Sequence, residues 1–161
     1  LLGAGDVPET PPSAYVEALF DDYADRFDKA LVERLDYSVP QKLAELIVTH
    51  KDRRFARAVD LGCGTGLFGA EIRDRVDLLE GFDLSANMLA KAAEKGLYDL
   101  LARADLSLDL ATSGLFNDGQ TTHRADLVSA ADVLMYLGDL ANAFALAARL
   151  GSGRQGRAAV E

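Results

Sequence analysis

The stretch that decides the fold is Val59-Asp60-Leu61-Gly62-Cys63-Gly64-Thr65-Gly66. Residues 57–61 are short, apolar and followed at once by glycines, which predicts a buried strand ending in a tight turn. Glycine permits positive φ and a close approach to a ligand, and the helix expected over 67–76 directs free N–H groups toward the turn. This order predicts a ligand site at the carboxyl end of a parallel strand. A glycine-rich turn without a ligand is the alternative, which three alternating glycines disfavour.

Outward from this turn, strands alternate with helices. Periodicity predicts helices at 14–35, 67–76, 85–95 and 140–150, and strands at 57–61, 78–83, 98–104 and 125–131. A further helix follows Ser38-Val39-Pro40-Gln41, which fits a capping box, and Ser85 fits an N-cap. The alternation predicts an α/β fold, a three-layer α/β/α sandwich on a mostly parallel sheet with N-terminal helices.

Length, charge and cysteine usage exclude several classes of protein. The chain has 161 residues, 49% of them apolar, and a net charge of −9, which indicates one domain and disfavours a nucleic-acid groove. It lacks the run of about 18 to 20 apolar residues that crosses a bilayer. With Cys63 as the sole cysteine, no intrachain disulfide or multi-cysteine metal site can form. We expect a soluble, cytoplasmic protein without a metal.

The chain divides into three expected parts. Residues 1–12 are rich in glycine and proline, which predicts a linker or surface arm. Residues 13–161 form the expected domain, with a helical cap at 13–50 and the α/β core at 57–161. The sequence leaves the oligomeric state open.

Two cofactor classes fit the glycine loop. Gly64, Gly66 and Gly69 satisfy the dinucleotide fingerprint, so an NAD(P)-dependent oxidoreductase is one reading. Asp60, directly before the glycines, is unfavourable beside a pyrophosphate and favours a ligand with an ammonium group. S-adenosyl-L-methionine (SAM) has such a group, a sulfonium and no phosphate. The helices before the first strand also favour SAM.

Acidic residues follow the next two strands. Asp83 ends the second, where a carboxylate can accept both ribose hydroxyls; its alternative role is a helix cap. Leu84 and Met88 could flank an adenine ring or pack in the core. Asp105, after the third strand, could accept the adenine amino group.

These motifs resemble those of class I SAM-dependent methyltransferases, which have a Rossmann-like fold. The resembling stretches are residues 60–66, 82–89, Ala104-Asp105-Leu106 and residues 130–137. Residues 18–28 are similar, more narrowly, to bacterial methyltransferases preceded by a tetratricopeptide region, which would make residues 1–12 the linker after a helical array. Relatives also carry strands after residue 150 that this sequence lacks, apart from the beginning of a fifth at 158–161. The last strands are therefore expected to be missing and the acceptor site incomplete.

The resemblance implies a methyl transfer from SAM to a small-molecule acceptor, with S-adenosyl-L-homocysteine (SAH) as product. A non-catalytic SAM-binding or interaction module is the alternative. The implied cofactor-binding residues are Asp60, Gly62, Cys63, Gly64, Gly66, Asp83, Leu84, Met88, Asp105 and Leu106, with Tyr23 and Arg26 as candidates for the methionyl carboxylate. Cys63 is read as a small filler. Asp132 and Tyr136 are the catalytic candidates beside the transferred methyl, with a turn cap as the alternative for Asp132. The acceptor is left open.

Overall fold

The computed structural model describes residues 13–34, 37–117, 121–152 and 157–160, without the side chains of 25–34 and 157–160. Within these ranges the helices are α1 (Ser13–Arg34), α2 (Val39–His50), α3 (Leu67–Ile72), α4 (Ala86–Glu94) and α5 (Ala141–Leu150), with 3-10 turns η1 (Arg73–Arg75) and η2 (Leu134–Tyr136). The strands are β1 (Phe55–Leu61), β2 (Val76–Asp83), β3 (Leu100–Arg103), β4 (Leu127–Ala130) and β5 (Arg157–Val160). The predicted linker at 1–12 lies outside the described residues. In the part described, no helix combines the length and apolarity that crossing a membrane requires.

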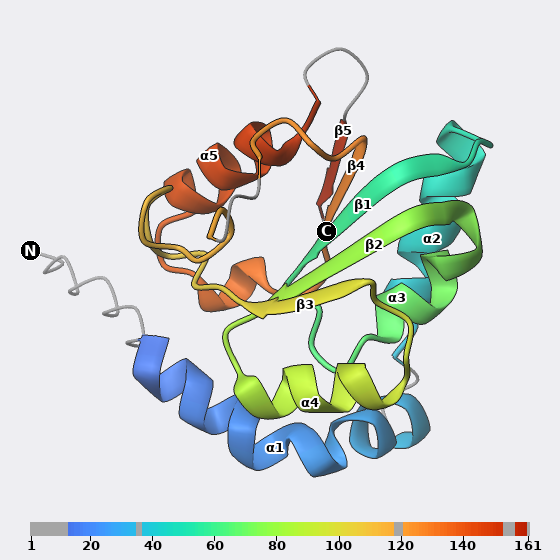
Figure 1. The fold of residues 1–161 in the computed structure, drawn as a ribbon. Helices are drawn as coiled ribbons and strands as arrows, with labels where there is room; N and C mark the ends of the chain where they lie inside the picture. Colours follow the sequence, from blue (N-terminus) through green and yellow to red (C-terminus); the bar gives the residue numbers. More distant parts are fainter. Residues whose placement is uncertain (1–12, 35–36, 118–120, 153–156, 161) are drawn as a thin grey trace, which may run out of the picture.

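The strands form one sheet in the order β3-β2-β1-β4-β5, and every pair of neighbours is parallel. The order in which strands are added along the chain changes direction at β1, since β2 and β3 lie on one side of it and β4 and β5 on the other. Helices cover both faces of the sheet (Figure 1). The predicted three-layer α/β/α sandwich is confirmed. β5 lies where the sequence indicated the beginning of a fifth strand.

Alternate side chains of β1 face two separate hydrophobic cores. Val59 and Leu61 belong to the core shared with α5, whereas Ala58 belongs to the core shared with α2 and α3. A parallel strand covered on both faces is apolar along most of its length, which explains the sequence of β1. Asp60 is the buried polar residue of this strand, since it is 1% exposed in the middle of the packing.

Some boundaries differ from the predictions. β1 begins at Phe55 and β2 at Val76, two residues earlier than predicted in each case, because these two buried residues pair with each other. Helix α3 ends at Ile72, short of the predicted residue 76. A 3-10 turn replaces its last part, and there the Arg73 guanidinium donates to Asp99 at 2.7 Å and to the Leu97 carbonyl at 3.1 Å.

The two predicted helix caps differ in outcome. The capping box at Ser38 is wrong, because its side chain makes no cap hydrogen bond and only its carbonyl accepts, from the Lys42 N–H at 3.0 Å. The N-cap at Ser85 is confirmed, since its Oγ accepts from the Met88 N–H at 3.1 Å.

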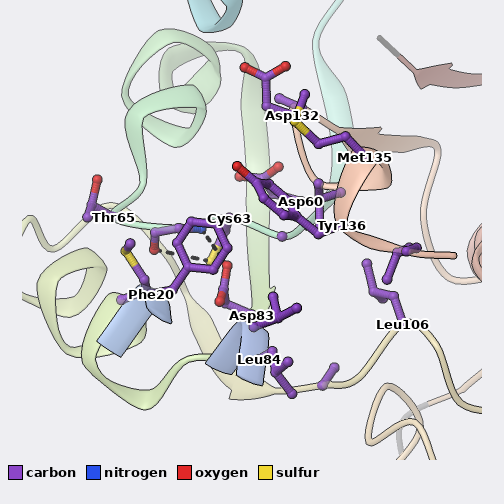
Figure 2. A pocket seen from close by; sticks show the side chains of 18 of the residues that line it. Phe20, Asp60, Cys63, Thr65, Asp83, Leu84, Leu106, Asp132, Met135 and Tyr136 are labelled. Carbon is purple, nitrogen blue, oxygen red and sulfur yellow. Dashed lines mark hydrogen bonds between the residues drawn. The ribbon is translucent and has the colours of Figure 1, made fainter. Parts of the chain in front are cut away.

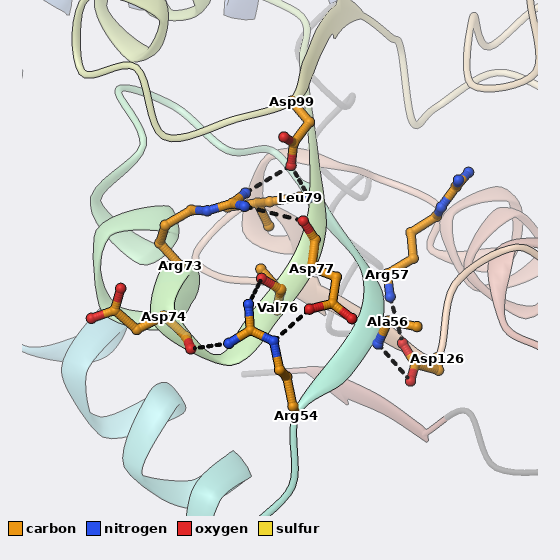
Figure 3. A network of polar contacts seen from close by, with 10 residues as sticks. All are labelled: Arg54, Ala56, Arg57, Arg73, Asp74, Val76, Asp77, Leu79, Asp99 and Asp126. Carbon is orange, nitrogen blue, oxygen red and sulfur yellow. Dashed lines mark hydrogen bonds and ion pairs between the residues drawn. The ribbon is translucent and has the colours of Figure 1, made fainter.

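Polar side chains join the strands at their amino ends (Figure 3). Arg54 contacts the Asp77 carboxylate and donates to the carbonyls of Asp74 at 2.8 Å and Val76 at 3.0 Å. Asp126, before β4, accepts from the backbone of β1 at Ala56, at 3.2 Å. These contacts hold one edge of the sheet together, and the cavity described next lies at the other edge.

Candidate functional site

A cavity of about 460 Å³ lies at the carboxyl ends of β1, β2 and β4. It is lined by residues at the ends of these strands and after β3, by helix α1, and by residues at the start of α2. Figure 2 shows many of these side chains around it. β1 and β4 are the neighbours between which the strand order changes direction. Open α/β sheets bind their ligands at this switch point, so the cavity occupies the position expected of a functional site.

The glycine loop, residues 62–66, needs glycine for both conformation and space. Gly62, Gly64 and Gly66 have φ angles of 68°, 52° and 87°, and residues other than glycine adopt such angles only at a cost in conformational energy. A Cβ on Gly62 would fall 2.4 Å from a methyl group of Val133. Gly62 and Gly64 line the cavity, whereas Gly66 lies at the N-cap of α3, outside the lining.

Asp60 lies under this loop with both carboxylate oxygens hydrogen-bonded. The Tyr98 hydroxyl donates to Oδ2 at 2.8 Å and the Ser129 hydroxyl to Oδ1 at 3.0 Å. The pKa of Asp60 is raised to about 7, mainly by burial and to a smaller extent by the charge of Asp83, whereas the two hydroxyls lower it. A cation beside Asp60 would favour its charged form, so this corner of the cavity favours a positively charged ligand group.

Asp83, at the end of β2, connects the glycine loop to helix α4. Its Oδ2 accepts from the Gly64 N–H at 2.8 Å and its Oδ1 from the Ser85 N–H at 2.9 Å. Burial raises the pKa of Asp83, and these backbone donors counteract it. Each carboxylate oxygen can accept a further hydrogen bond, which suits a ligand with two neighbouring hydroxyls. The N-cap of α4 is Ser85 and not Asp83, so the alternative role of Asp83 as a helix cap is wrong, and its hydrogen bonds leave room for the predicted ligand role.

The predicted adenine-binding residues surround one end of the cavity. Asp105 accepts from the Ser107 N–H at 2.9 Å and from the Ser107 hydroxyl at 2.6 Å, both at Oδ1. Leu84, Met88 and Leu106 supply apolar walls. Met88 is 1% exposed and packs as a core residue of α4, and its contact with an adenine ring stays a prediction.

Helix α1 covers the cavity through aromatic side chains. Tyr23 and Phe20 line it, and the Phe20 ring meets the Tyr136 ring edge to face with centroids 4.9 Å apart. Asp21 fixes the helix to α4: its Oδ1 contacts the Ser85 hydroxyl and accepts from the Asn87 N–H at 3.2 Å. The side chain of Arg26 lies outside the described residues.

Asp132 and Tyr136 both line the cavity on the side of β4. Asp132 has a φ of 52°, rare for a residue with a side chain. Burial and the neighbouring Asp132 carboxylate raise the pKa of Tyr37. Burial and the Asp132 charge raise the pKa of Tyr136. Cys63 is also in the lining, and burial raises the pKa of its thiol well above the usual range. An uncharged buried thiol agrees with the reading of Cys63 as a filler.

Comparison with known families identifies the core that carries this cavity. Residues 59–151, more than half of the chain, match a family described as a methyltransferase domain. The chain belongs to this family. Between the two enzyme classes that the glycine loop left open, membership favours the methyltransferase over the NAD(P)-dependent oxidoreductase.

Three individual proteins resemble this methyltransferase domain. A malonyl-[acyl-carrier protein] O-methyltransferase of Buchnera aphidicola is 33% identical over 85 residues, 52% of this chain and 34% of the relative. A TehB-like SAM-dependent methyltransferase from Corynebacterium glutamicum has a TM-score of 0.64 and 25% identity, over 89% of this chain and 72% of that one. A putative SAM-dependent methyltransferase from Methanococcus maripaludis shares the fold, with a TM-score of 0.69 and 20% identity, over 87% and 62%. The chain spans about a third of the length of the curated relative.

Sequence reasoning missed several residues that line the site of this methyltransferase domain. The missed side chains include Phe20, Tyr37, Thr65, Val133 and Met135. Val133 and Met135 lie in the stretch that resembled a family motif, so their positions carried a signal. Phe20 and Tyr37 come from the cap, and their proximity to the residues after β4 depends on how α1 and α2 pack.

Proposed function

We propose that this methyltransferase domain binds SAM in the cavity and transfers its methyl group to a small-molecule acceptor, releasing SAH. One observation carries the proposal: the glycine loop, Asp60 and Asp83 converge on one cavity at the switch point of the sheet. Their chemistry fits the parts of SAM. Carboxylates face an ammonium and a ribose diol, and apolar walls face an adenine ring.

The proposed contacts follow the order of the strands. Gly62 and Gly64 admit the methionyl part, with Asp60 near its amino group. Asp83 accepts the ribose hydroxyls, and Asp105 accepts the adenine amino group between apolar neighbours. Tyr23, and Arg26 from the cap, are proposed near the methionyl carboxylate. Each role matches a group that lines the cavity except that of Arg26, which rests on the resemblance alone.

When bound, the cofactor supplies a methyl group activated by the sulfonium, and the protein supplies alignment and a site sheltered from water. Phe20 of α1 and Tyr136 after β4 both line the cavity and meet edge to face, so the cap contacts the opposite wall of the site. Asp132 is proposed to face the acceptor, with the Tyr37 side chain beside it. A carboxylate there can orient an acceptor N–H or O–H and take up its proton.

The charge of the lining restricts the acceptor. Asp60, Asp83, Asp105 and Asp132 all line the cavity. Carboxylates repel a second anion in a site sheltered from water. We therefore propose an acceptor that is neutral or cationic at the atom to be methylated. This differs from the malonyl group named for the curated relative.

One further expectation stays a prediction. The tetratricopeptide region rests on the similarity of residues 18–28 to bacterial methyltransferases that carry one.

Calorimetry with SAH tests the proposed cofactor. The wild-type domain is expected to bind SAH with one site per chain. Asp83→Asn keeps the side chain's size but removes its charge, and is expected to weaken binding at least tenfold. Asp74→Asn, an exposed aspartate in η1 at the opposite edge of the sheet, is the matched control and should bind as wild type does. Absence of SAH binding by the wild type would refute the proposal.

A further inference from the structure

Tyr98, in the connection between α4 and β3, reaches Asp60 from the hydrophobic core next to the glycine loop. Its hydroxyl donates to Asp60 Oδ2 at 2.8 Å, and its ring packs against the hydrophobic core shared with α2 and α3. Tyr98 does not belong to the lining of the cavity as the described residues form it. The hydrogen bond to Asp60, which does line the cavity, is therefore a route by which Tyr98 can affect a ligand.

Three glycines make the space for this ring. A Cβ would fall 2.4 Å from the Tyr98 hydroxyl oxygen if placed on Gly69, 2.7 Å from a ring carbon if placed on Gly81, and 3.0 Å from another if placed on Gly66. Real Cβ atoms do not approach that closely, so a side chain at Gly69 or Gly81 would displace the tyrosine.

Gly69 and Gly81 have no conformational need for glycine. Positive φ angles occur at Gly62, Gly64, Gly66, Gly96 and Gly114 within the described residues, and not at these two. Gly69 lies inside helix α3 and Gly81 inside strand β2, where glycine is unfavourable for the element itself. Accommodation of Tyr98 accounts for both. The third glycine of the apparent dinucleotide fingerprint thus makes room for a tyrosine.

We propose that Tyr98 is a positioning residue for cofactor binding: its hydroxyl holds the Asp60 carboxylate in place and stabilises its charged form toward the cofactor's ammonium group. This rests on the proposed function, because it takes the ligand to be SAM or SAH. The Ser129 hydroxyl holds the other oxygen, at 3.0 Å. Both donors are neutral hydroxyls, so neither cancels the charge of the ionised carboxylate, which is then available to the ligand.

The groups around Asp60 decide how its charge depends on pH. Tyr98, Tyr37, Cys63 and Asp83 are the titratable groups in electrostatic contact with it. The tyrosines and the cysteine are uncharged at neutral pH, and burial raises their pKa values further above it; Asp83 opposes a second negative charge. Burial raises the pKa of Asp60 to about 7. Affinity for a cationic ligand should therefore increase as the pH rises through this value and decrease below it.

Tyr98→Phe tests the proposal, because it keeps the ring and removes only the hydroxyl. The loss of a donor that favours the charged form raises the pKa of Asp60. The pH midpoint of SAH affinity, measured by calorimetry between pH 5 and 8.5, should move upward by about one pH unit. A purely structural effect would lower affinity equally at every pH. Tyr15→Phe, an exposed tyrosine outside the cavity lining, is the matched control and should leave the midpoint unchanged.

A second variant and a second measurement separate the possible failures. Gly69→Ala places a Cβ against the hydroxyl and should reproduce the shift with Tyr98 intact. Carbon-13 NMR of the Asp60 carboxyl in the ligand-free protein should show the same upward movement in Tyr98→Phe. If the wild type binds SAH and both variants keep its pH profile, the role of Tyr98 is refuted and the proposed function stands. If the wild type does not bind SAH, the proposed function fails, and so does the role of Tyr98 in cofactor binding.

Discussion

Replacing Asp60 by asparagine should stabilise the fold while removing the carboxylate charge proposed to face the ligand. Asparagine has nearly the same shape as aspartate, and its amide can serve both neighbours: its oxygen can accept from Tyr98, and its nitrogen can donate to Ser129. These two hydroxyls now bond the two oxygens of Asp60 at 2.8 and 3.0 Å. The variant removes the charge that burial opposes. It therefore isolates the energetic cost of a buried carboxylate at this position.

The magnitude follows from the pKa of Asp60. Folding raises it from 3.8 to about 7, so the folded state retains a proton that the unfolded state loses. Stability from this proton is fully present below pH 3.8 and is lost as the pH rises through 7. At about 1.4 kcal/mol per pKa unit the whole effect is about 4 kcal/mol, of which about 2 to 3 kcal/mol falls between pH 5 and pH 8.

Urea denaturation at pH 5 and pH 8 measures this difference. The free energy of unfolding of the wild type should fall by about 2 to 3 kcal/mol more than that of Asp60→Asn between the two pH values. Asp74→Asn, exposed at the other edge of the sheet, should follow the wild type. If the free energy of unfolding changes with pH by the same amount in the wild type and in Asp60→Asn, the reasoning is refuted, because Asp60 would then have the same pKa in the folded and unfolded states.

Three other substitutions test separate parts of the structure. Gly62→Ala adds a Cβ 2.4 Å from Val133, so in urea denaturation it should lower the free energy of unfolding by about 2 kcal/mol more than Gly96→Ala does. Gly96 is the matched control, because it has a φ of 63° but open space around it. Equal losses of stability would contradict the packing argument. Asp21→Ala removes the side-chain acceptor for Ser85 and Asn87. Hydrogen exchange of the backbone amides in α1 should become faster and SAH affinity should fall about tenfold. Unchanged exchange would show that other contacts hold α1. Glu80→Gln removes the charge that faces Arg124; the Glu80 side chain is 8% exposed and that of Arg124 is 3% exposed. The variant should lower the free energy of unfolding by about 3 kcal/mol and leave SAH affinity unchanged. A loss under about 1 kcal/mol would contradict a buried ion pair.

Local patterns predicted the central part of the fold. The strand, glycine loop and helix from β1 to α3 depend on neighbouring residues, and Asp83 and Ser85 are close enough in sequence for their roles to be anticipated. Asp83 and Asp105 line the cavity as expected, because the carboxyl ends of parallel strands meet at one edge. Boundaries such as Phe55 and Val76 depend on pairing between strands, which no single stretch of sequence encodes.

Contacts between distant segments could not be predicted. Tyr98 lies 38 residues from Asp60, and nothing in its own neighbourhood indicates the hydrogen bond. Gly69 fitted a dinucleotide fingerprint, and only the position of the Tyr98 ring shows the space it provides. The contact of Phe20 with Tyr136 depends likewise on where helix α1 packs.

The structure of the chain in complex with SAH tests the central claim most directly. The account predicts SAH in the cavity at the carboxyl ends of β1, β2 and β4. Its ribose hydroxyls should lie within hydrogen-bond distance of the Asp83 carboxylate, and its amino group should face Asp60. SAH bound elsewhere, or bound in the cavity with its ribose away from Asp83, would contradict the account.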